Sequence, residues 1–227
     1  MISKNIKDIL ERIEKAKSKT GRKDDIKLIA VTKTIPVDKI KEAIYSGITD
    51  IGENRVQEAD VKFIELFKTE SAIKKHLIGH LQTNKVKKAI EIFDIIQSVD
   101  SIHLLEDINK QSEKISKIQE CFVEIKVSEE DTKFGLPPNE LKNFLDKAKE
   151  LKNITITGLM TIAPFLENPE SVRPYLKKAF GYYSAFKTDY LLKYLSMGMT
   201  SDFEVAIEEG ANMVRVGTGI FGERKYG

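Results

Sequence analysis

Eight short apolar runs recur along the chain, with segments of helical periodicity between them. The runs cover residues 28–32, 48–52, 76–79, 95–99, 122–127, 155–160, 194–197 and 213–216. Several lack alternation of polar and apolar residues, which is typical of parallel strands covered on both faces. Strands that are each paired with a helix, eight in all, favour a closed (β/α)8 barrel over an open sheet. The sequence therefore predicts an α/β fold, a single TIM-barrel domain over residues 1–227.

Three helical segments have a clear apolar face. In the first, which should end near Gly21, apolar residues recur at steps of four and three: Ile2, Ile6, Ile9, Ile13 and Ala16. We expect this extra N-terminal helix to dock on the outside of the barrel; the alternative is a helix that binds a membrane surface or a partner. The two later faces are Leu141, Phe144, Leu145, Ala148 and Leu151, and Val172, Leu176, Ala179, Tyr183 and Phe186.

Composition argues against several classes of protein. The chain has 37 basic and 35 acidic residues, a net charge of +2, which disfavours a nucleic-acid binder. Cys121 is the only cysteine, so we expect no internal disulfide and a cytoplasmic location. The longest stretch without a charge, residues 153–166, is too short to span a bilayer. His76, His80 and His103 have no carboxylate at ligand spacing, so no metal site is expected.

Glycine-rich segments follow the last two predicted strands. Gly217 and Thr218 come after the eighth strand, and Gly198 and Thr200 come after Ser196 at the end of the seventh. Glycines allow close backbone approach to a phosphate, and TIM barrels commonly bind phosphate after strands seven and eight. Each segment alone is more often a simple turn. Together, at these two strands, they predict a phosphate ligand.

Two polar residues are candidates for helix caps. Asn54 with Gln57 fits a cap of the following helix, and the alternative is that Asn54 points into the barrel mouth. Ser201 with Glu204 has the spacing of a capping box, which predicts a helix start at Ser201. The positive end of that helix would favour an anion.

Lys33 closes the first buried strand, after Val31 and Thr32. Its side chain either extends to solvent or points into the barrel mouth. In the second case, removal from water lowers the pKa of the ammonium group and favours a nucleophilic amine. A lysine opposite a phosphate site suggests an aldehyde-bearing phosphate held as a Schiff base, with pyridoxal 5'-phosphate (PLP) the obvious candidate.

Two further residues have both structural and functional interpretations. His80 either polarises or packs against a ligand, or only bonds a neighbouring loop. Arg215 is a permanent charge inside an apolar strand, and burying it alone is costly. Its partner is either a carboxylate or a ligand acceptor such as a pyridine nitrogen.

The strand-end motifs resemble those of the pyridoxal phosphate homeostasis protein family over essentially the whole chain. They occur, in chain order, at residues 31–34, 52–58, 78–85, 133–135, 158–161, 195–202 and 214–222. The resemblance implies a barrel of the alanine racemase N-terminal type. It implies that Lys33 carries the Schiff base and that Arg215 meets the pyridine nitrogen. It also implies a phosphate site at Ser196, Gly198, Thr200, Gly217 and Thr218, with Asn54 and His80 at the mouth.

The resemblance also implies a function in vitamin B6 homeostasis. The expected protein binds PLP, limits the free aldehyde and passes it to apo-enzymes, without established catalytic turnover. The alternative is a PLP-dependent amino-acid racemase-like enzyme; a third reading is a sugar-phosphate enzyme with an aldolase-type lysine. Alanine racemases carry a C-terminal β domain that supplies a tyrosine as second base. The sequence stops at Gly227 with only Tyr226 nearby, so we expect no second base and a monomer.

Overall fold

Eight parallel strands close into a barrel in chain order in the computed structural model, which describes residues 1–66, 73–128 and 134–223. The strands are β1 Lys27–Val31, β2 Asp50–Glu53, β3 Lys74–Leu77, β4 Ile95–Val99, β5 Gln119–Glu124, β6 Ile154–Met160, β7 Tyr194–Ser196 and β8 Met213–Val216. The predicted (β/α)8 barrel is therefore confirmed. Lys133 and Tyr226 lie outside the described residues.

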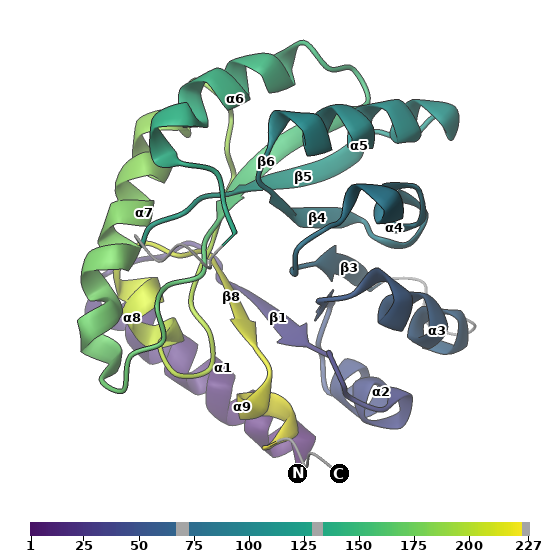
Figure 1. The fold of residues 1–227 in the computed structure, drawn as a ribbon. Helices are drawn as coiled ribbons and strands as arrows, with labels where there is room; N and C mark the ends of the chain where they lie inside the picture. Colours follow the sequence, from purple (N-terminus) through teal and green to yellow (C-terminus); the bar gives the residue numbers. More distant parts are fainter. Residues whose placement is uncertain (67–72, 129–133, 224–227) are drawn as a thin grey trace.

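Helices surround the barrel on its outer side (Figure 1). They are α1 Ile2–Lys19, α2 Val37–Tyr45, α3 Val56–Leu66, α4 Val86–Ile92, α5 Ile102–Lys114, α6 Leu141–Lys149, α7 Arg173–Phe186, α8 Phe203–Glu208 and α9 Thr218–Phe221. Three single turns, η1 Thr83–Lys85, η2 Pro138–Glu140 and η3 Pro169–Val172, precede α4, α6 and α7. None of the helices in the described residues is long and apolar enough to cross a membrane.

The N-terminal helix α1 packs against α8, α9 and α2 on the outside of the barrel, as predicted (Figure 1). The five residues of its predicted stripe are the ones that it buries. Asn5 Nδ2 donates to the carbonyl oxygen of Ile220 at 2.8 Å, and Arg12 forms two hydrogen bonds with Glu204, at 3.2 and 2.6 Å. In the described part of the chain after β8, the four-residue α9 is the one helix, and α1 completes the ring of helices between α8 and α2.

Three strands differ from their predicted bounds by two residues or more. Strand β3 covers Lys74–Leu77, so it begins and ends two residues before the predicted range 76–79. Strand β2 begins at Asp50 and ends at Glu53, later than residues 48–52, because both carboxylates are buried within the sheet. Strand β5 ends at Glu124, three residues before the predicted end at 127. Beyond it, Ile125 leaves the ladder and forms an isolated bridge with Leu136. Apolar runs do not identify strands whose buried positions are polar or charged.

The barrel interior contains an apolar cluster and a polar cluster. The apolar cluster comprises Ile29, Ile95, Phe122, Met160 and Met213, with Tyr194 packed against it. The polar side chains His76, Gln97, Ser196 and Arg215 are also buried and belong to β3, β4, β7 and β8. The barrel interior is thus packed with side chains, and these four polar ones come from two pairs of adjacent strands.

Candidate functional site

A cavity of about 340 Å³ opens at the carboxyl ends of β1, β2, β7 and β8. Its volume falls in the usual range for small-molecule and cofactor sites. The lining residues are Val31, Lys33, Asn54, Ile78, Ile162, Phe165, Met199, Thr200, Ser201, Arg215, Gly217 and Thr218. Six of the nine predicted site residues are in this set: Lys33, Asn54, Thr200, Arg215, Gly217 and Thr218.

Lys33 lines the cavity with a half-buried side chain, and hydrogen bonds hold the backbone on both sides of it. Thr32 Oγ1 donates to Glu53 Oε1 at 2.7 Å. The backbone N–H of Thr34 donates to Glu58 Oε1 at 2.5 Å. Thr34 has a φ of 64°, a left-handed conformation that is unusual for a residue other than glycine. The bond to Glu58 therefore fixes an unfavourable turn directly after Lys33.

Lys62 of α3 joins the two carboxylates that anchor this turn. Its Nζ donates to Glu53 Oε1 at 2.9 Å, to Glu58 Oε1 at 2.5 Å and to the carbonyl oxygen of Thr32 at 2.7 Å. Burial raises the pKa of Glu53, although Lys62 and Thr32 favour its charged form. Lys62 thus compensates a buried carboxylate and ties α3 to the segment that carries Lys33.

Arg215 is buried in the barrel and contacts neutral acceptors. One terminal nitrogen donates to Ser196 Oγ at 2.7 Å and the other to the carbonyl oxygen of Thr161 at 2.8 Å. Among the described residues, no carboxylate forms an ion pair with Arg215. Burial lowers the pKa of Arg215 to about 10, and the more distant charges of Glu124 and Asp202 oppose this shift. The structure thus provides no direct carboxylate partner here, which favours the ligand-acceptor interpretation.

The segments after β7 and β8 are tied to each other. Thr200 Oγ1 accepts a hydrogen bond from the backbone N–H of Gly219 at 3.3 Å. Gly198 has a φ of 90°, and a Cβ there would lie 2.5 Å from the Cβ of Ala206. Its carbonyl oxygen accepts from the backbone N–H of Arg215 at 3.0 Å. Gly198 therefore shapes the turn behind the cavity and does not line it.

The predicted capping box at Ser201 is wrong. Helix α8 begins at Phe203 with Asp202 in the N-cap position. Asp202 Oδ1 accepts instead from the backbone N–H of Met199, at 2.6 Å. Ser201 lines the cavity together with Thr200 and Thr218.

His80 lies beside the cavity rather than in it. Its ring stacks on Phe134 with centroids 3.9 Å apart, and its Nδ1 lies 3.6 Å from Asp100 Oδ2. It lines an adjoining cavity of about 530 Å³ that shares Asn54 with the first one. A Cβ on Gly79 would lie 2.5 Å from the carbonyl oxygen of Asn54, so glycine is required where these two strand ends meet. Helix α3 begins at Val56, so Asn54 precedes its N-cap position.

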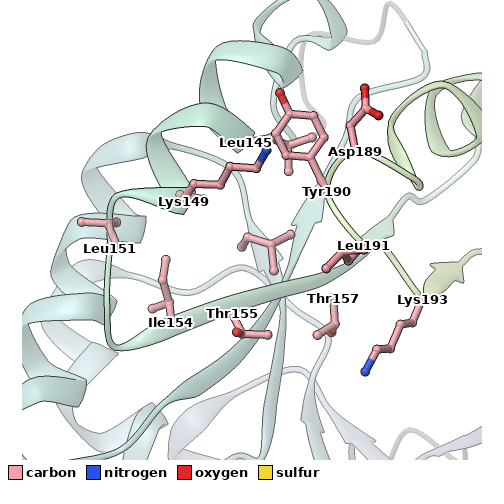
Figure 2. A pocket seen from close by; sticks show the side chains of 12 residues that line it. Leu145, Lys149, Leu151, Ile154, Thr155, Thr157, Asp189, Tyr190, Leu191 and Lys193 are labelled. Atoms are coloured by element: carbon pink, nitrogen blue, oxygen red, sulfur yellow. The ribbon is translucent and has the colours of Figure 1, made fainter.

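Another cavity, of about 410 Å³, lies at the opposite end of the barrel (Figure 2). It is bounded by α6, the first residues of β6 and the segment before β7. In Figure 2 the Lys149 side chain runs beside the Tyr190 ring, with its Nζ 4.1 Å from the ring centroid. Active sites of TIM barrels lie at the carboxyl ends of the strands, so we assign no role in the chemistry to this cavity.

Comparisons with known proteins establish the family. The family model for the alanine racemase N-terminal domain matches residues 5–225. A pyridoxal phosphate homeostasis protein from Aquifex aeolicus (strain VF5) is 44% identical, over 96% of this chain and 96% of its own length. One from Escherichia coli (strain K12) is 35% identical, over 99% of this chain and 97% of its own length. The chain belongs to the pyridoxal phosphate homeostasis protein family.

Solved structures agree with membership of the pyridoxal phosphate homeostasis protein family. The structure of PipY from Synechococcus elongatus PCC7942 with PLP bound has a TM-score of 0.86 and 32% identity, covering 98% of this chain and 100% of PipY. Alanine racemase from Clostridium difficile 630 has a TM-score of 0.71 and 20% identity, covering 95% of this chain and 55% of the racemase. The second likeness shows the shared barrel alone, and it confirms the predicted alanine racemase N-terminal type of fold.

Proposed function

We propose that this chain binds PLP in the cavity at the carboxyl ends of its strands and serves in PLP homeostasis. The observation that carries the proposal is the convergence of Lys33, Arg215 and Thr218 on one cavity. When bound, PLP supplies an aldehyde that reacts with amines. Lys33 would hold that aldehyde as a Schiff base, and the turn anchored by Glu53 and Glu58 would orient its side chain.

The remaining lining residues fit the other two ends of the cofactor. Thr200, Ser201 and Thr218 offer hydroxyl donors to a phosphate, and Gly217 allows close backbone approach. Arg215 would donate to the ring nitrogen. Guanidinium scarcely ever gives up a proton, so it would keep that nitrogen unprotonated. An unprotonated ring is a poor electron sink, which favours storage over catalysis.

The composition of the cavity supports a carrier over a racemase-like enzyme. A racemase needs two acid–base groups on opposite faces of its substrate. Among the described residues that line the cavity, Lys33 is the one side chain with an amine, and none of the others has a carboxylate, an imidazole or a phenol. The third reading, a sugar-phosphate enzyme, is distinguished by the visible spectrum of the protein as purified.

The delivery of PLP to apo-enzymes is tested by transfer. Loaded protein is mixed with an apo-enzyme in the presence of an amine that scavenges free PLP. We expect activation of the apo-enzyme to survive a scavenger concentration that blocks activation by free PLP. If the scavenger blocks both, the protein buffers PLP without transferring it to the apo-enzyme.

We further propose that the protein is a cytoplasmic monomer. Sedimentation of the loaded protein tests the oligomeric state.

Thr218→Ala is expected to weaken PLP binding. The change removes one hydroxyl donor to a dianion, and a hydrogen bond to a charged group contributes roughly 1.5–3 kcal/mol. The dissociation constant should therefore rise about tenfold or more. Equilibrium dialysis against PLP measures it. Pyridoxal without phosphate serves as the control ligand, since its affinity should not change; an unaltered PLP affinity would place the phosphate elsewhere.

Little exchange of the α-proton of alanine is expected. Loaded protein is incubated with alanine in deuterated water, and incorporation of deuterium at Cα is followed by NMR. With Lys33 as the single base in the described cavity and Arg215 at the ring nitrogen, exchange should be slow. Exchange with turnovers per second would support the racemase-like enzyme instead.

A further inference from the structure

A continuous line of hydrogen bonds crosses the inside of the barrel. From Arg215 it passes to Ser196 Oγ at 2.7 Å, and from there to Gln97 Oε1 at 2.7 Å. Gln97 Nε2 lies 2.9 Å from His76 Nδ1, and His76 Nε2 lies 2.9 Å from Asp50 Oδ1. The five side chains come from β8, β7, β4, β3 and β2, and each is at least nine-tenths buried. We call this line the interior chain.

The charges at its two ends fix the direction of every bond in the interior chain. Arginine can only donate, so Ser196 Oγ accepts from it and must send its own proton elsewhere. Gln97 Oε1 takes that proton, which turns the amide nitrogen of Gln97 toward His76. His76 Nδ1 therefore accepts, and its Nε2–H donates to the Asp50 carboxylate. Every donor points from the cation at the barrel mouth toward the carboxylate at the opposite end.

Each side chain of the interior chain prevents its neighbour from adopting a different hydrogen-bond orientation. Without Gln97, the Ser196 proton is free to turn toward the guanidinium and displace it. Gln97 Nε2 also donates to Met213 Sδ at 3.3 Å, but a thioether is a weak acceptor. Without His76, that contact alone opposes a flip of the Gln97 amide that would present its N–H groups to Ser196. The carboxylate of Asp50 has a further donor in Thr49 Oγ1 at 2.7 Å, and Lys27 Nζ lies 4.0 Å away. Hydrogen bonds thus hold the Asp50 end of the interior chain, as they hold its Arg215 end.

We propose that Gln97 and His76 are positioning residues for Arg215. Acting through Ser196, they hold the guanidinium so that its remaining donors face the cavity and meet the ring nitrogen of PLP. The inference rests on the proposed function. It also gives Ser196 a role that differs from the predicted one: a fully buried link to Arg215 rather than a phosphate ligand. The interior chain extends from Arg215 at the cavity to Asp50, the first residue of β2.

The test compares PLP with its analogue in which a CH group replaces the ring nitrogen. Wild-type protein should bind PLP roughly tenfold more tightly than the analogue, as expected for one charge-assisted hydrogen bond. Gln97→Met keeps the length of the side chain and breaks the interior chain. It should reduce that preference by roughly threefold or more, with little change for the analogue. Ser196→Ala should do the same, and the double variant should lose no more than either single one.

Gln119→Met is the matched control. Gln119 is also fully buried, at the start of β5, but its Nε2 donates to the carbonyl oxygens of Asp94 and Glu120 at 2.8 and 3.1 Å, away from the interior chain. The Gln119→Met variant should be less stable than the wild type, and its preference for PLP over the analogue should be unchanged. A preference that survives Gln97→Met, or an equal loss for both ligands, overturns the inference and leaves the proposed function standing. Equal binding of both ligands by the wild type overturns the Arg215 contact and the inference with it, and no binding of PLP overturns the proposed function.

A pair of variants at His76 covers the case in which Gln97→Met does not fold. His76→Asn places an amide oxygen close to the position of the ring Nδ1, so it keeps an acceptor for Gln97. His76→Leu removes that acceptor. The preference for PLP should persist in the asparagine variant and fall in the leucine variant. Equal preference in the two variants overturns the inference.

Discussion

Replacing Lys33 with alanine is expected to abolish covalent attachment of PLP. Lys33 follows the end of β1 by two residues and lines the same cavity as residues of the segments after β7 and β8. A Schiff base needs an amine, and the variant offers none at that position. Its visible absorbance band should disappear, while some reversible binding through the phosphate should remain. Spectra of wild type and variant with added PLP measure the difference.

Borohydride reduction identifies the attached residue. In the wild type, the reduced adduct should be found by mass spectrometry on one peptide, the one that contains Lys33. Lys85→Ala is the matched control, because Lys85 belongs to the adjoining cavity beside Asn54 and should leave the adduct unchanged. An adduct on Lys85 or Lys133 with Lys33 unmodified would show that the wrong lysine had been assigned.

The barrel could be predicted from the sequence because its signals are local. A buried parallel strand is an apolar run, and a docked helix is an apolar stripe, so each is visible within a few residues. The α1 stripe was predicted residue by residue. The strand bounds failed where a buried position is charged, as at Asp50 and Glu53. Such residues are tolerated because partners from other strands or helices compensate them, and those partners are not neighbours in sequence.

The candidate site could be predicted only in part, for the same reason. Lys33, Gly217 and Thr218 line the cavity because they directly follow strands, and the barrel gathers all strand ends at one mouth. Ser196 also ends a strand, yet its side chain turns inward to Gln97, which lies 99 positions earlier in the chain. Side chains along a strand alternate between the barrel interior and the surrounding helices, and a shift of one residue exchanges the two sets. The stagger of the strands then sets how far an inward side chain lies from the mouth. A hydrogen bond such as the one from Ser196 to Gln97 can be predicted only when the register of the strands in the closed barrel is known.

Glu124→Gln is expected to stabilise the protein at alkaline pH. Glu124 ends β5 and is buried at the barrel mouth. Burial raises its pKa to about 7; the charge of Asp100 adds to the shift and that of Arg215 opposes it. The unfolded chain loses this proton near the ordinary value of about 4.3, well before the folded protein does. The contribution of Glu124 to the free energy of unfolding therefore falls as the pH rises from about 4 to 7.

A glutamine stays neutral in both states and so removes that loss. The difference between the ordinary and the raised pKa corresponds to about 4 kcal/mol, and the variant gains most of it at pH 8 relative to pH 4. Urea unfolding of both proteins without bound PLP, at several pH values, measures the gain. Glu113→Gln, at an exposed position on α5, is the control and should show no such dependence. A Glu124→Gln effect that is the same at every pH would mean that the pKa of Glu124 is the same in the folded and unfolded states, with Arg215 offsetting the cost of burial.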